Sequence, residues 1–62
     1  MKVVHRDREY EATGGATARD VLLKLGLDPE AFLVLRNGKL VDDSAILKDD
    51  DEVKLVAVVS GG

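Results

Sequence analysis

Apolar residues recur with a helical period in one segment near the middle of the chain. Four of them share one stripe of an α-helix, at positions i, i+3, i+4 and i+7: Ala18, Val21, Leu22 and Leu25. Thr17 precedes the stripe as a predicted N-cap, and Asp20 favours the positive end of the helix. Gly26 follows it, where a left-handed residue commonly ends a helix. A helix of about ten residues is marginal alone in water, so it must pack on a sheet.

The segments on either side of this helix predict β-strands. Residues 1–6 and 8–13 predict a hairpin, because the first is rich in valine and the second alternates polar and apolar residues. FLVLRNGKLV predicts a second hairpin that turns at Asn37-Gly38. The segment VKLVAVV, residues 53–59, predicts a last strand. Together with the helix, these strands predict an α+β fold with a mixed sheet of about four to five strands and the helix on one face.

Two of the predicted strands are apolar at consecutive positions, although a single helix can cover only one face of the sheet. Alternation predicts an inner set that packs under the helix: Phe32, Val34, Val53, Leu55 and Ala57, with Val3, Ala12, Val21, Leu22 and Leu25. The outward set is then Leu33, Leu35, Val56 and Val58. Because a contiguous exposed apolar patch usually marks a partner site, we predict that these four residues bind another protein.

The remaining segments predict turns and loops. Asp28-Pro29 predicts a turn, because proline disfavours helix at the residue before it. In the long loop DDSAILKDDDE we expect Ile46 and Leu47 to act as apolar plugs and Ser44 to cap a short turn. The acidic run from Asp49 to Glu52 predicts a solvated turn, with docking into a basic groove as the alternative.

Composition excludes several classes of function. The chain has 62 residues, which suffice for one domain, and no cysteine that could form a disulfide or a thiolate metal site. Its net charge of −3 argues against binding to nucleic acid or to anionic lipid. No apolar run is long enough to span a membrane, and the N-terminal segment lacks the pattern of a secretory signal. These features predict a cytoplasmic protein that does not bind membranes.

No set of side chains predicts a catalytic or metal site. His5 is the sole histidine, and strand alternation places it with Val3 at the edge of the core, which favours a structural role. The carboxylates of the acidic run do not follow the loop pattern of known calcium sites. TGGAT lacks the lysine of a phosphate-binding loop, so it predicts a turn.

Several features taken together resemble a known family. They are the order of the elements, the short NGK hairpin, the acidic turn KDDDEV before the last strand, and Gly61-Gly62 at the end. This combination resembles the ubiquitin-like sulfur carriers of the ThiS/MoaD family, which have the β-grasp fold with the first and last strands parallel. Small archaeal modifiers and tRNA-thiolation carriers are close relatives of that family. The resemblance extends over the whole chain. The apolar approach to the glycines, ending in Val58-Val59-Ser60, is more similar to these carriers than to ubiquitin, which has arginines there.

The resemblance implies a carrier that is not itself an enzyme and binds no cofactor of its own. An E1-like partner would use ATP and Mg²⁺ to adenylate the carboxylate of Gly62, and a sulfur donor enzyme would convert it to a thiocarboxylate. That group would donate sulfur to a biosynthetic enzyme, in cofactor biosynthesis or in tRNA thiolation. We predict a monomeric domain, residues 1–59, followed by a tail, residues 60–62, that is flexible because serine and two glycines have no apolar side chain to anchor it. In this tail Ser60 could contact the partner, and Gly61 would allow close approach.

Two alternatives remain open at this point. The chain could be a protein modifier that is conjugated through Gly62 to lysines of target proteins. It could also be a β-grasp interaction module whose glycine tail has no function.

Overall fold

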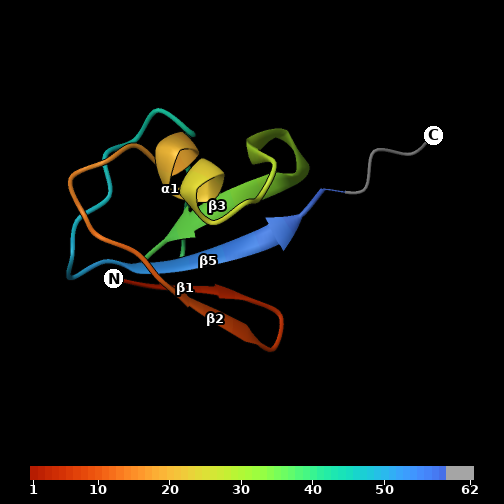
Figure 1. Cartoon of the computed structure of the whole chain (residues 1–62), viewed down its shortest axis with the longest axis horizontal. Coiled ribbons are helices and arrows are strands. Elements are labelled where there is room, and N and C mark those ends of the chain that lie inside the picture. Colours follow the sequence, from red (N-terminus) through yellow and green to blue (C-terminus); the bar gives the residue numbers. More distant parts are fainter. Residues whose placement is uncertain (59–62) are drawn as a thin grey trace.

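The computed structural model describes residues 1–58, in which one helix lies against one face of a five-stranded sheet (Figure 1). The strands follow the order β2-β1-β5-β3-β4 across the sheet. A short 3-10 helix, η1, precedes β3. The elements are β1 (Lys2–His5), β2 (Arg8–Glu11), α1 (Ala18–Lys24), η1 (Pro29–Ala31), β3 (Phe32–Arg36), β4 (Lys39–Val41) and β5 (Glu52–Ala57).

The sheet joins two hairpins through its central strand. β5 pairs parallel with β1 and antiparallel with β3, so the first and last strands of the chain lie side by side. The hairpin turns use left-handed backbone, with φ of 59° at Arg6, 52° at Asn37 and 82° at Gly38. Consecutive positive φ angles at Asn37 and Gly38 match the twist of the flanking strands, as in a type I′ turn. The predicted β-grasp fold and its central parallel pair are confirmed.

The helix α1 begins and ends at the predicted signals. The Thr17 hydroxyl accepts a hydrogen bond from the Asp20 amide at 3.1 Å, which satisfies one free donor of the first turn. Gly26 has a φ of 77°, and the Leu27 amide donates to the Leu22 carbonyl at 2.9 Å. These are the features of a Schellman C-cap. The helix spans seven residues rather than about ten, because Leu25 already serves as its C-cap.

The core lies between α1 and the inner sheet face, meaning the side of the sheet that faces α1. Its buried members are all apolar: Val3, Ala18, Val21, Leu22, Val34, Leu47, Val53 and Leu55. Ala12, Leu25 and Phe32 are half-buried and pack against them. The prediction for Ala57 was wrong, since Ala57 is exposed. It pairs with Phe32 at the last position of the β3–β5 ladder, at the margin of the sheet.

The loop between β4 and β5 closes the core from the side of the helix N-terminus. The Ala18 amide donates to the Ala45 carbonyl at 2.9 Å, and the Leu47 amide donates to the Ala16 carbonyl at 2.9 Å. Only one of the two predicted plugs is buried, because Leu47 is 1% exposed and Ile46 is 51% exposed. Ile46 forms a β-bridge with Thr17, and the alternation of extended backbone turns the two neighbouring side chains to opposite sides.

The element boundaries differ from the predicted ones by a few residues. Asp28-Pro29 opens the 3-10 helix η1 rather than a simple turn, and the Asp28 carboxylate accepts from the Glu30 amide at 3.0 Å. The strands of the first hairpin are shorter than residues 1–6 and 8–13. β5 ends at Ala57, and the predicted residues 59–62 lie outside the described part of the chain.

Candidate functional site

The outer sheet face, meaning the side of the sheet away from α1, presents the alternate residues of the strands whose inner residues form the core. Val3, Val34, Val53 and Leu55 point inward and are buried, so their neighbours in each strand point outward. The outward residues of the four strands β1, β3, β4 and β5 are Lys2, Val4, Leu33, Leu35, Leu40, Glu52, Lys54 and Val56.

The predicted apolar patch, defined as Leu33, Leu35, Val56 and Val58, lies on this face toward the end of β5. Leu33 and Val56 are directly opposite each other on β3 and β5, and they are 46% and 40% exposed. Val58 follows β5 and is 43% exposed. Leu35 is half-buried and lies opposite Lys54, two pairs along the ladder. The structure therefore leaves three of the four predicted residues exposed, with 40–46% of their surface open to solvent.

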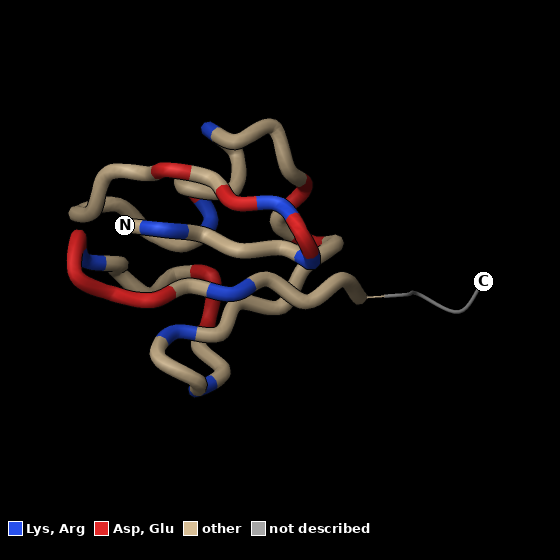
Figure 2. The backbone as a smooth tube through the Cα atoms, turned by 90° about the horizontal axis from the view of Figure 1, so that it is seen from below, with Lys and Arg blue, Asp and Glu red and all other residues tan. Residues whose placement is uncertain are grey.

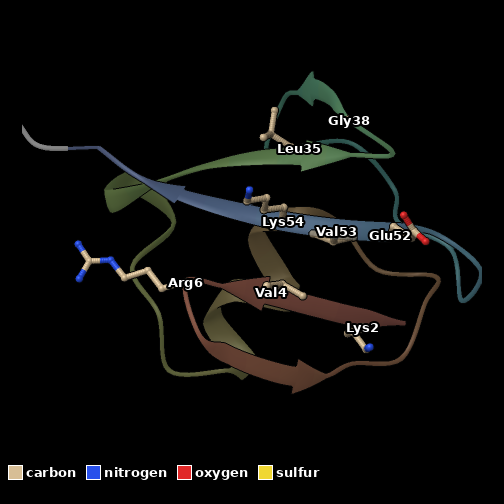
Figure 3. Close-up of a pocket in the computed structure, with 8 residues that line it drawn as sticks. All are labelled: Lys2, Val4, Arg6, Leu35, Gly38, Glu52, Val53 and Lys54. Carbon is tan, nitrogen blue, oxygen red and sulfur yellow. The ribbon is translucent and has the colours of Figure 1, made fainter.

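A shallow hollow adjoins the apolar patch on the same face. Figure 3 shows its lining residues, which come from β1, β3, β5 and the turns after β1 and β3: Lys2, Val4, Arg6, Leu35, Gly38, Glu52, Val53 and Lys54. Leu35 belongs both to this hollow and to the apolar patch. The hollow combines an apolar floor at Val4 and Leu35 with three cationic side chains and one carboxylate.

The end of β5 is fixed against the start of β3. The Val58 amide donates to the Ala31 carbonyl at 2.8 Å, which continues the contact between the two segments beyond the last strand pair. The apolar patch therefore borders the point at which the chain leaves the sheet. The other predicted site residues, Ser60, Gly61 and Gly62, lie outside the described residues.

The acidic run lies at the other end of β5, as Figure 2 shows by the continuous red segment at the start of the strand. Its side chains organise the neighbouring loops. Asp49 accepts a hydrogen bond from the Gly14 amide at 2.7 Å, and a Cβ atom at Gly14 would lie 2.4 Å from the Asp49 nitrogen. Gly14 is therefore required for the close approach of these two loops.

Asp51 anchors the same loop. Its carboxylate accepts from the Lys48 amide at 2.9 Å and from the Asn37 side-chain amide at 3.3 Å. The hydrogen bond from the Lys48 amide, supported by the bond from Asn37 and by the nearby Arg36 and Lys48 charges, lowers the pKa of Asp51 despite the opposing desolvation. Within residues 1–58 no group of three or more histidine or acidic side chains is arranged to hold a metal ion.

His5 lies at the edge of the core, as strand alternation predicted. Its ring contacts Phe32 edge to face, with centroids 4.7 Å apart and an angle of 83° between the planes. The Nε2 atom is buried and has no hydrogen-bond partner among the described residues. The packing against Phe32 accounts for the position of His5 without a ligand.

Sequence reasoning named only the apolar outward residues of β3 and β5 and missed other residues of the same face. Val4, Leu40 and Lys54 also lie on the outer sheet face. The signal was available for Val4 and Lys54, because each immediately follows a residue that was predicted to point inward. Leu40 could be placed only through its pairing with Leu35.

Comparison with known proteins places this chain in a family. The model of the ThiS family matches residues 1–62. Sulfur carrier protein TtuB of Thermus thermophilus is 32% identical over 65 residues, and the alignment covers 100% of both chains. A thiazole synthase of Magnetococcus marinus is 30% identical over 66 residues, covering 100% of this chain and 20% of that protein. The chain belongs to the ThiS family and is a sulfur carrier of the ThiS/MoaD type.

The described residues also bear on membrane association. Among residues 1–58, no helix has the length and apolar character needed to cross a bilayer.

Proposed function

We propose that this chain carries sulfur as a thiocarboxylate on Gly62. An E1-like enzyme that binds ATP and Mg²⁺ adenylates the terminal carboxylate, and a sulfur donor enzyme supplies the sulfur. The resulting thiocarboxylate donates sulfur to an acceptor enzyme, in cofactor biosynthesis or in tRNA thiolation. The observation that carries the proposal is the alignment of this chain with a sulfur carrier protein, which covers the full length of both proteins.

The chemistry explains why activation is needed. A carboxylate is a poor electrophile, since its negative charge is delocalised and its oxygen leaves poorly. Attack of a carboxylate oxygen on the α-phosphate of ATP forms an acyl-adenylate and releases pyrophosphate. Hydrosulfide from the sulfur donor enzyme then attacks the acyl carbon and loses its proton, and AMP leaves with the electron pair of the broken bond. The product is a C-terminal thiocarboxylate, which is a soft nucleophile.

The residues at the end of the chain suit this reaction. Glycine has no Cβ, so Gly61 and Gly62 can pass through a narrow channel and bring the carboxylate beside a nucleotide. The hydrogen bond from Val58 to Ala31 holds the base of this segment at one end of the sheet. The carrier would thus supply the reacting carboxylate, while the partner would supply the nucleotide site and the catalytic groups.

The apolar patch supports docking of the adenylating enzyme on the outer sheet face. Leu33, Val56 and Val58 are exposed next to the end of β5, so a protein that covers them also reaches the following residues. Because these side chains are 40–46% exposed, covering the rest of each contributes roughly 1 kcal/mol to binding. The similarity to one fifth of a thiazole synthase supports thiazole formation as one destination of the sulfur.

Intact mass spectrometry of the protein recovered from its native cell tests the proposal. We expect a species heavier than the unmodified chain by the mass difference between one sulfur and one oxygen atom, located on Gly62 by fragmentation. Conjugates in which Gly62 is joined to lysines of other proteins would favour the role of a protein modifier. Absence of both species, under conditions in which sulfur transfer is active, would contradict the proposal.

A variant lacking Gly62 provides the matched control. It should lose ATP-dependent activation and retain its thermal stability, because glycine has no side chain that a core could bury. A chain with one additional residue after Gly62 should behave in the same way. If this extended chain is fully activated in the absence of a processing protease, the carboxylate of Gly62 is not the group that reacts with ATP.

A further inference from the structure

A cationic side chain stands in the middle of the outer sheet face. Lys54 is exposed and belongs to β5, the central strand of the sheet. In the strand register it is paired with Val4 of β1 on one side and with Leu35 of β3 on the other. Figure 3 shows Lys54 between these two apolar residues, across three neighbouring strands. A protein that covers Val4 and Leu35 therefore also covers Lys54.

Covering Lys54 removes its ammonium group from water, which is unfavourable unless the charge gains a partner. A lysine near the rim of an interface avoids this cost by extending its charged end into solvent. Lys54 is poorly placed to do so, because β5 has two strands on each side and the sheet edge is about 10 Å away. A docked protein that extends over the full sheet must therefore supply an acceptor for this charge.

The surroundings of Lys54 indicate the chemistry of that acceptor. Three of the residues that line the hollow are cationic and one is acidic: Lys2, Arg6, Lys54 and Glu52. Lys2 pairs with Glu9 at 3.6 Å, whereas Lys54 forms no ion pair with any residue of the described segment 1–58. Because Glu9 compensates Lys2, the remaining charges that line the hollow are Arg6, Lys54 and Glu52, an excess of one positive charge on a chain whose net charge is −3. A carboxylate complements it better than a neutral or cationic group.

We propose that the hollow receives an acidic side chain of the docked protein, whose carboxylate forms an ion pair with the Lys54 ammonium. The apolar groups of Val4 and Leu35 on either side contact the methylene groups of that side chain or its apolar neighbours. The partner surface would therefore be apolar opposite Leu33 and Val56, and acidic opposite Lys54. This inference rests on the proposed function, since it takes the adenylating enzyme as the protein that covers this face.

Replacement of Lys54 by methionine separates this proposal from purely apolar docking. If the partner offers no carboxylate, Lys54→Met removes a desolvation cost and binding stays equal or becomes tighter. If the partner offers a carboxylate, Lys54→Met leaves that group buried without a partner. Binding should then weaken by about 30-fold or more. Lys54→Arg keeps the positive charge and should bind within about threefold of the wild type.

The measurement is the dissociation constant of the full-length chain with the purified E1-like adenylating enzyme of the same organism, at low and at high salt. Wild-type binding should weaken as salt rises, and Lys54→Met should lose most of this dependence. Lys24→Met is the matched control, because Lys24 is exposed on α1, away from the outer sheet face. It makes the same change of net charge and should bind within about twofold of the wild type. Circular dichroism checks that each variant is folded.

The outcomes distinguish this inference from the proposed function. Equal or tighter binding of Lys54→Met overturns the ion pair and leaves sulfur transfer unaffected. If Lys24→Met weakens binding as much as Lys54→Met does, the effect comes from the net charge of the chain, and the proposed ion pair is also overturned. Failure of the proposed function would instead appear in the wild-type chain, as absence of binding and of ATP-dependent activation, and the ion pair would be rejected with it.

Discussion

Near its end, β5 carries apolar side chains on both faces, yet the two faces serve opposite purposes. Val53 and Leu55 point toward α1 and are each 3% exposed, whereas Val56 points away from it and is 40% exposed. These residues are similar in size and hydrophobicity, so the side chain itself does not explain the difference. The helix covers one face of the sheet, and among the described residues no element covers the other. Whether an apolar residue of β5 is buried therefore depends on the sheet face to which it points, and not on the type of its side chain.

The comparison separates stability from recognition. Residues of the inner face contribute to folding, because they leave water when the chain folds. Val56 and Leu33 stay partly in water in the free protein, so their exposed apolar surface remains available for association with another protein. A substitution on the inner face should change the free energy of unfolding, and one on the outer face should change binding.

The largest expected effect comes from placing the same charge on each face. Leu55→Asp should prevent folding, because it removes a core side chain and buries a carboxylate with no cationic partner. The cost of about 4–5 kcal/mol or more matches the whole stability of a small domain. Val56→Asp should change the free energy of unfolding by about 1 kcal/mol or less, since the site is half open to solvent. Circular dichroism with urea titration measures both.

Binding completes this comparison. Val56→Asp should fold and should weaken docking of the adenylating enzyme by more than Val56→Ala does, because the introduced carboxylate must lose water at the interface. If Val56→Asp unfolds the domain as severely as Leu55→Asp, the assignment of the two faces of β5 is reversed, and the apolar patch is rejected with it.

The next effect concerns the loop that closes the inner face. Leu47→Ala should lower the free energy of unfolding by about 2–5 kcal/mol, because it leaves a cavity beside the core. Ile46→Ala, at the adjacent exposed position, should cost about 0.5 kcal/mol or less. Thermal and urea denaturation provide the values. Comparable losses in the two variants would show that Ile46 contributes to the core and that the loop does not alternate as described.

A smaller effect is expected at the start of α1, the helix that covers the inner face. Thr17→Ala removes the acceptor of the Asp20 amide and should cost about 1 kcal/mol. Thr13→Ala is a suitable control, because Thr13 is exposed and precedes the capping position. The outer face is not involved, so the affinity for a partner should remain that of the wild type. If Thr17→Ala is fully folded and still binds the partner more weakly than the wild type, the separation of folding stability from partner binding is contradicted.

The smallest effect is the dependence of stability on pH through Asp51, which lies outside both faces. Hydrogen bonds lower its pKa in the folded chain below the unfolded value of 3.8. Its contribution is therefore fully present above the unfolded pKa and is lost as pH falls through the folded pKa. Stability measured below about pH 4 should fall less steeply in Asp51→Asn than in the wild type. If the stability of the two proteins falls equally with pH in this acidic range, Asp51 does not contribute to the pH dependence of folding.

Local signals in the sequence predicted most of the fold. The helix, its Thr17 cap and its Gly26 terminator follow from the 3.6-residue period and from the chemistry of helix ends. The Asn37-Gly38 turn follows from its need for positive φ at two consecutive residues. Strand alternation also separated Leu33 and Val56 from Val34 and Leu55, which assigned the candidate docking face.

Other features depended on contacts between segments that are distant in the chain. The burial of Leu47 and the exposure of Ile46 depend on the bridge to Thr17. Ala57 is exposed because the β3–β5 ladder ends at its pair with Phe32. Lys54 lies between Val4 and Leu35 because β5, near the end of the chain, pairs in this register with both β1 and β3.

The sequence by itself therefore determined the elements and the direction in which their side chains alternate, because hydrogen bonding and steric preferences act over only a few residues. The tertiary structure alone decided where each strand ends, which loop residue is buried and which charge lies in the middle of the outer sheet face. These depend on strand register and on what covers each surface, and both arise from packing between distant segments.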